Sequence, residues 1–95
     1  QIALERAERM YVEAHRAEVL ADQVSAWQYS NQLRQYIAAM RQAVDDIEES
    51  PERDEAFEWI DWAMRHLEQL DPLGRRLAMP DTPLPTVDVL RPFLR

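Results

Sequence analysis

Carboxylates and histidines are the side chains through which this sequence could do chemistry. The 95 residues contain 18 Asp and Glu, two His and no Cys. The carboxylates are densest between residues 45 and 61, where Arg53 is the one base. Such a cluster could bind a cation or dock a basic partner, although a block of like charges is usually a solvated surface. It lacks EF-hand spacing, which requires alternating ligands around a central Gly.

The two histidines do not complete a metal or catalytic site. A carboxylate-bridged metal centre in a helical bundle uses Glu-x-x-His on facing helices, whereas Glu13 precedes His15 by two residues and Asp61 precedes His66 by five. No Ser lies in a Gly-x-Ser-x-Gly turn, and no Gly-rich loop could cradle a phosphate. We therefore predict no catalytic residues, no cofactor and no metal, and we expect the chain not to be an enzyme.

Charge and hydropathy limit the partners of the chain. The formal net charge is -7 and every base is Arg, which disfavours nucleic-acid binding through bulk charge. Arg75 and Arg76 form an isolated basic pair and would be the contact if nucleic acid were bound. No apolar run approaches the roughly 18 residues that span a bilayer, so no membrane partner is predicted and a cytoplasmic location is expected. The first residue is Gln1 rather than Met, and we expect the chain to be part of a longer protein.

Helix formers and breakers predict an all-α fold. Residues 1–49 contain no Gly or Pro and are rich in Ala, Glu, Arg, Gln and Leu, so we predict a long helix over about 2–48. Ser50 suits an N-cap and Pro51 the first position of a second helix, over about 51–70. The short connection predicts that this second helix folds back antiparallel to the first.

The two helices should form a coiled-coil-like helical hairpin over 1–71. Asp71-Pro72 ends the second helix, and Gly74 is a candidate left-handed residue after it. Residues 72–95 are interrupted by several prolines yet rich in Leu and Val. We expect this segment to be a Pro-rich extended C-terminal arm, packed on the hairpin or on a partner, because a free linker would be more polar.

The apolar stripe of the long helix changes character along its length. In the second half it consists of large residues at helical spacing, namely Leu33, Ile37, Met40, Val44 and Ile47. The second helix offers a matching face, formed by Ala56, Trp59, Ile60, Ala63, Leu67 and Leu70. In the first half the same spacing carries mostly methyl groups, at Ala3, Ala7, Met10, Ala14, Ala17, Ala21 and Val24.

Helix length decides what the alanine-rich half implies. At 1.5 Å per residue the long helix would measure about 70 Å and the second about 30 Å, so residues 1–27 have no partner within the hairpin. A second copy, an upstream segment or another protein could supply one. Alternatively, the long helix breaks near Asp22–Ser25 and the pieces fold into a monomeric three-helix bundle. The lack of Gly or Pro there favours the continuous helix.

Several short motifs resemble an uncharacterised C-terminal helical region of bacterial proteins, some of them tied to mobile elements. The matching residues are Ala26-Trp27, Leu33-Arg34, Tyr36-Ile37, Trp59, Trp62-Ala63 and Leu70-Asp71-Pro72-Leu73. The resemblance covers about residues 20–73. It implies an appended C-terminal module, and it implies no activity and no functional residues.

These patterns predict a non-enzymatic module for protein–protein interaction or oligomerisation, associating through the N-terminal half of the long helix. The partner would be a second copy, giving a homodimer, or another protein. The expected interface residues are Ala7, Met10, Ala14, Ala17, Ala21, Val24, Trp27 and Trp62. The alternative is an accessory C-terminal domain of a nucleic-acid-processing or mobile-element protein. Trp27 and Trp59 lie on or beside apolar faces and are expected to pack in the core. Trp62 groups with Trp59 and His66 toward the edge of the buried face of the second helix.

Overall fold

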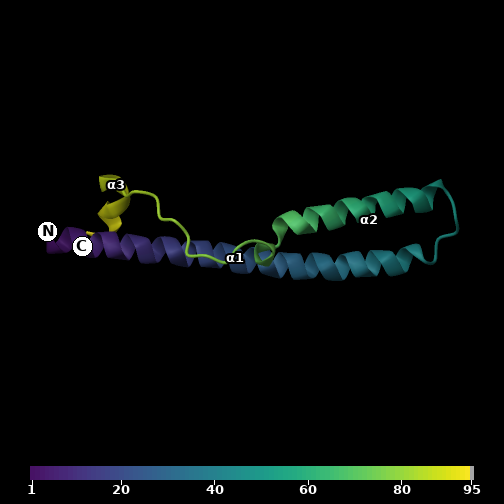
Figure 1. The fold of residues 1–95 in the computed structure, drawn as a ribbon, viewed down its shortest axis with the longest axis horizontal. Coiled ribbons are helices and arrows are strands. Elements are labelled where there is room, and N and C mark those ends of the chain that lie inside the picture. The colour runs from purple at the N-terminus through teal and green to yellow at the C-terminus, as the bar shows by residue number, and fades with distance from the viewer. Residues whose placement is uncertain (95) are drawn as a thin grey trace. The chain divides into compact units, whose positions relative to one another are not determined.

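The computed structural model describes residues 1–94, and within them the fold is all-α with no strand (Figure 1). Two long helices are followed by short helical turns near the C-terminus. The elements in order are α1 (Ile2–Val44), α2 (Pro51–Leu70), η1 (Pro72–Gly74), α3 (Val87–Leu90) and η2 (Arg91–Phe93). The predicted long helix followed by a shorter antiparallel one is confirmed.

Helix α1 is uninterrupted, so the alternative with a break near Asp22–Ser25 is not what the structure contains. The helix ends at Val44, before the predicted end near residue 48. Past Val44 the backbone tightens, because Asp45, Asp46 and Ile47 each donate to a carbonyl three residues earlier, at 3.2, 3.2 and 3.0 Å. Aspartate is a poor helix former, and this tightened turn carries the chain toward the cap of α2.

Local chemistry sets the limits of α2 as the sequence predicted. The Ser50 hydroxyl accepts a hydrogen bond from the Arg53 amide at 3.2 Å, and Pro51 occupies the first turn. At the other end the Asp71 amide donates to the Leu67 carbonyl at 3.1 Å. Gly74 does not adopt the left-handed conformation that was expected. The chain leaves α2 through the Asp71 cap and Pro72, neither of which needs a positive φ.

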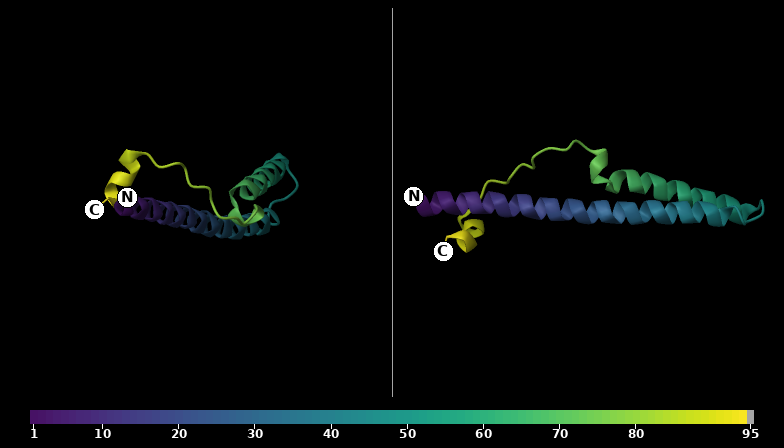
Figure 2. Two further views of the ribbon diagram at one scale, coloured as in Figure 1. Left: turned by 60° about the vertical axis from the view of Figure 1, so that its left-hand side comes forward. Right: turned by 90° about the horizontal axis from the view of Figure 1, so that it is seen from below.

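The described chain divides into two compact units. The hairpin unit, residues 24–76, contains α2 running back along the C-terminal half of α1 (Figures 1 and 2). Its core is one seam between the two helices, made of Ile37, Val44, Ile60 and Ala63, all at most 5 % exposed. Leu33, Met40, Ala56, Met64 and Leu67 pack around these four residues. The large-residue stripe of α1 therefore faces α2, as its spacing predicted.

The terminal unit joins residues 1–23 to the C-terminal segment, residues 77–94, with α3 beside the first turns of α1 (Figures 1 and 2). Ala7 is fully buried and Leu90 is 5 % exposed. The Tyr11 and Phe93 rings meet edge to face, with centroids 6.4 Å apart. His15 Nε2 lies 3.1 Å from the Asp81 carbonyl oxygen. The N-terminal half of α1, which the hairpin cannot cover, thus has a partner within the chain.

The C-terminal segment was expected to be an extended arm over its whole length, but it ends in two short helical turns. It is extended as far as Thr86, whose hydroxyl then caps α3 by accepting from the Val89 amide at 3.4 Å. Pro92 lies in the first turn of η2. A Thr cap and an early Pro both favour a helical turn. These turns contain Leu90, which is buried, and Phe93, whose ring meets Tyr11 of α1.

Candidate interaction surfaces

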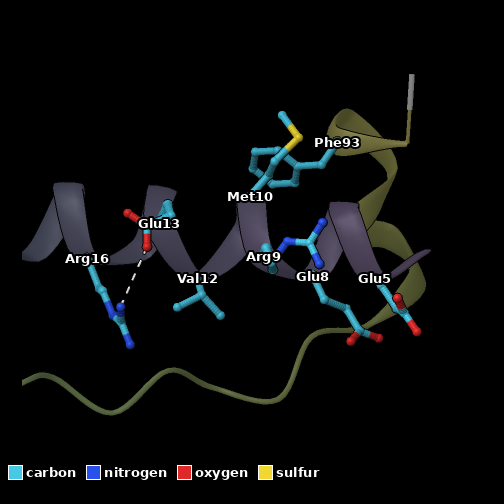
Figure 3. A pocket seen from close by; sticks show the side chains of 8 residues that line it. All are labelled: Glu5, Glu8, Arg9, Met10, Val12, Glu13, Arg16 and Phe93. Atoms are coloured by element: carbon cyan, nitrogen blue, oxygen red, sulfur yellow. Dashed lines mark ion pairs between the residues drawn. The ribbon is translucent and has the colours of Figure 1, made fainter. Parts of the chain in front are cut away.

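The predicted interface residues of the terminal unit fall into two groups. In the first group Ala7 is buried, and Met10 lines the same depression as Phe93 of the C-terminal segment (Figure 3). Ala14, Ala17 and Ala21 are exposed and form the second group. The structure therefore leaves only the later part of the predicted alanine stripe free.

The half-buried residues and the exposed alanines of α1 lie in different directions around the helix. Five residues of α1 in the unit with the C-terminal segment are half-buried, and three of them, Tyr11, His15 and Val19, are spaced four apart. Each residue advances the helix by about 100°, which places Ala14, Ala17 and Ala21 about a third of a turn away from them. Leu20, 61 % exposed, borders this second face. The exposed alanines Ala14, Ala17 and Ala21 thus lie off the row formed by Tyr11, His15 and Val19.

The remaining predicted interface residues belong to the hairpin unit. Val24, Trp27 and Trp62 are 45 %, 43 % and 49 % exposed. For Trp27, the expectation of core packing is wrong. The same holds for Trp59, which is 57 % exposed. Trp59 immediately precedes the core residue Ile60, so the helix turns its indole by about 100° away from the seam, and a hairpin with one seam has no second layer to cover it.

Trp59, Trp62 and His66 form an aromatic ladder along α2. The two indoles stack with centroids 5.5 Å apart and an interplanar angle of 9°. The His66 ring stacks on Trp62 at 4.9 Å and 18°. The spacing of three and then four residues makes this possible, since it aligns side chains on one side of a helix. The sequence grouped these residues at an edge of α2 without indicating that they stack.

The basic pair after α2 has a structural role at one of its two positions. The Arg75 guanidinium donates to the Gln69 carbonyl at 3.0 Å, and so satisfies one of the carbonyls left open at the end of α2. Arg76 is exposed. Helix capping by Arg75 removes half of the predicted nucleic-acid contact, so the geometry gives that alternative no specific support.

Asp71 organises the open end of the hairpin. Its carboxylate accepts from the Leu73 amide at 3.0 Å and forms an ion pair with Arg34 of α1. The Leu73 hydrogen bond, followed by the hydrogen bond and the positive charge of Arg34, lowers the pKa of Asp71 below its ordinary value of 3.8. The Asp71 side chain is 16 % exposed. This contact fixes the end of α2 to α1 on one side of the seam.

Neither the acidic cluster at residues 45–61 nor a depression in the terminal unit forms a recognisable ligand site. Within residues 1–94 no group of three or more His, Asp or Glu is placed to hold a metal ion. The depression, of about 900 Å³, is lined by three Glu, two Arg and three apolar residues (Figure 3). Glu13 and Arg16 form an ion pair at its edge, 3.6 Å apart. Its lining carries charges of both signs in nearly equal number, so it favours neither an anion nor a cation.

The fold and its surfaces define a helical hairpin with a C-terminal segment that covers part of the long helix. In the described part of the chain, no helix has the length and apolar character needed to cross a membrane. No protein-family model matches the sequence, and neither the curated proteins nor the solved structures contain a match to it. The resemblance to bacterial C-terminal helical regions therefore stays a prediction, and function has to be argued from the surfaces themselves.

Proposed function

We propose that this chain is a non-enzymatic oligomerisation module that associates through the N-terminal half of α1. The observation that carries the proposal is an exposed apolar stripe on that helix. It comprises Ala14, Ala17, Leu20 and Ala21 and continues on the same helix to Val24. Toward the N-terminus the stripe is buried at Ala7, in the unit that contains the C-terminal segment, and it is exposed at Ala14, Ala17 and Ala21.

The spacing of the stripe suits a second helix. Met10, Ala14, Ala17, Ala21 and Val24 alternate steps of four and three residues, which is the repeat of a coiled-coil seam. Methyl side chains at Ala14, Ala17 and Ala21 let two helix axes approach closely, since interaxial distance follows side-chain size. Leu20, 61 % exposed, adds larger apolar surface at one edge. A contiguous exposed apolar stripe of this kind marks an interaction site, and we assign a second copy of the chain as its partner.

Sedimentation equilibrium of the wild type and two single variants tests the proposal. Ala17→Glu places a charge in the stripe, whereas Gln23→Glu adds the same charge to an exposed position of α1 that is a third of a turn or more from Ala14, Ala17 and Ala21. We expect Ala17→Glu to weaken self-association at least about tenfold, equivalent to about 1.4 kcal/mol. Gln23→Glu should stay within about twofold of the wild type.

Circular dichroism distinguishes weaker association from unfolding, because both variants should keep the helix content of the wild type. Two results would refute the proposal. One is a wild-type chain that stays monomeric at high concentration. The other is an Ala17→Glu chain that self-associates as tightly as Gln23→Glu.

A further inference from the structure

One flank of the hairpin unit is closed by contacts between its helices. Arg34 of α1 pairs with Asp71, and the Arg41 guanidinium contacts the Met64 sulfur of α2. Relative to the core residue Ile37, Arg41 is turned by about 40° to one side, and Met64 is turned by the same amount relative to Ile60. Because these side chains meet, the two helices share this flank.

The opposite flank is open and aromatic. Tyr36 immediately precedes Ile37 and Trp59 immediately precedes Ile60, so both are turned by about 100° to the other side of the seam. Tyr36 is 62 % exposed, and the ladder of Trp59, Trp62 and His66 continues the same side of α2. Since the helices share one flank, they share the other, and aromatic side chains from both helices lie on it.

The exposed area of this flank is large enough for the centre of an interface. An aromatic side chain offers about 150–250 Å², so the exposed parts of Tyr36, Trp59 and Trp62 amount to roughly 250–420 Å². A stable interface takes about 800 Å² from each partner. The three side chains would supply up to half of that area, in the apolar centre where Trp and Tyr dominate binding energy. The surrounding helix surface would supply the rest.

Charge is distributed unevenly along the hairpin. The turn end, residues 45–61, carries nine carboxylates and one Arg. The open end carries Arg34, Arg65, Arg75 and Arg76 against Glu68 and Asp71. Two hairpins side by side in the same direction would place one acidic turn on the other. In opposite directions, each acidic turn lies beside a basic open end, which favours association in that orientation.

We propose that a second copy of the chain docks on the aromatic flank in antiparallel orientation, hairpin on hairpin. The two hairpin units then form a four-helix bundle, with Trp62 near the two-fold axis. Two-helix hairpins bury a single seam, and pairing them supplies the second layer that a bundle core has. A two-fold interface uses the same patch on both copies, which fits one aromatic flank per chain. This interface is separate from the α1 stripe and does not depend on it.

Single substitutions in the Ala17→Glu background test this interface apart from the α1 stripe. Trp62→Ser removes the centre of the aromatic flank. Phe57→Ser is the matched control, because Phe57 is also an aromatic of α2, 42 % exposed, but lies on the flank of Met64. By sedimentation equilibrium, the background chain should still dimerise. Trp62→Ser should weaken that dimer at least about tenfold, and Phe57→Ser should change it by less than about threefold.

Cross-linking tests the orientation, and the absence of Cys makes single-cysteine variants unambiguous. Glu55 and Gln69 lie seven residues before and after Trp62, on the same side of α2. An antiparallel dimer places residue 55 of one copy near residue 69 of the other. A mixture of Glu55→Cys and Gln69→Cys chains, treated with a short bis-maleimide, should give the cross-linked dimer of the two variants. Each variant alone should give little cross-linked dimer.

Each unfavourable outcome overturns a specific claim. A monomeric Ala17→Glu chain, or equal effects of Trp62→Ser and Phe57→Ser, would refute the aromatic interface and leave the α1 stripe standing. Strong cross-linking of Glu55→Cys with itself would refute the antiparallel orientation. If Ala17→Glu leaves wild-type association unchanged while Trp62→Ser abolishes it, the α1 stripe is refuted and the aromatic interface is supported.

Discussion

Replacing Leu90 with Ala should release the C-terminal segment from α1. Leu90 is 5 % exposed and is the one side chain of residues 77–94 that is buried. The substitution removes three carbons from that site, and each buried CH₂ contributes about 0.8 kcal/mol. The docked state therefore loses about 2.4 kcal/mol, and at 1.36 kcal/mol per factor of ten the docking equilibrium falls roughly 50-fold.

Hydrogen exchange at the end of the segment measures this equilibrium. The Leu90 amide donates to the Thr86 carbonyl at 3.1 Å, and the Leu94 amide donates to the Arg91 carbonyl at 3.2 Å. A helix as short as α3 is unstable by itself in water, so both amides exchange when the segment leaves α1. In Leu90→Ala we expect their exchange to accelerate by up to about 50-fold. Tryptophan fluorescence would not detect the release, because Trp27, Trp59 and Trp62 all belong to the hairpin unit.

Leu84→Ala is the matched control, since Leu84 is another leucine of the same segment but is 92 % exposed. Its removal should change exchange by no more than about twofold, as for other surface substitutions. If Leu90→Ala exchanges at the same rate as Leu84→Ala, then Leu90 does not hold the C-terminal segment in the terminal unit, and the prediction is refuted.

Two further predictions concern the hairpin unit. Ile60→Ala removes three carbons from a side chain that is 3 % exposed in the seam, so it should lower the free energy of unfolding by about 2–4 kcal/mol in urea denaturation followed by tryptophan fluorescence; a loss below about 1 kcal/mol would contradict the assignment of the core. Asp71, whose folded-state pKa is lowered, stabilises the fold above its ordinary pKa, and this stabilisation is lost as the pH falls through the folded-state value. The urea midpoint of Asp71→Asn should therefore depend less on pH below about pH 5 than that of the wild type, and parallel curves for the two proteins would rule this role out.

The limits of the long helices could be predicted because they depend on residues close in sequence. Ser50 and Pro51 start α2 through contacts within one turn, and Asp71-Pro72 ends it in the same way. The large-residue stripe of α1 was also correctly assigned to the seam with α2. The end of α1 was less well predicted, because the tightened turn after Val44 depends on where the chain must go next.

The exposure of the aromatic residues could not be predicted from spacing. Trp59 and Ile60 are adjacent and both apolar, and either could have been placed in the seam. Which one faces α1 depends on the axis of the neighbouring helix, and a rotation of about 100° separates a buried residue from an exposed one. Trp62 and His66 were grouped at the edge of α2, but their stacking follows from the rotamers that the structure adopts.

The sequence by itself determined an all-α chain with a continuous long helix, a capped second helix and a hairpin between them, because capping, proline geometry and helix propensity act over a few residues. Only the tertiary structure decided how the C-terminal segment is used. Leu84 and Leu90 have the same side chain in the same Pro-rich segment, yet Leu84 faces solvent and Leu90 is buried with Ala7 in the terminal unit. That choice depends on contacts between residues more than 60 positions apart, such as His15 with Asp81 and Tyr11 with Phe93, and no local pattern encodes them.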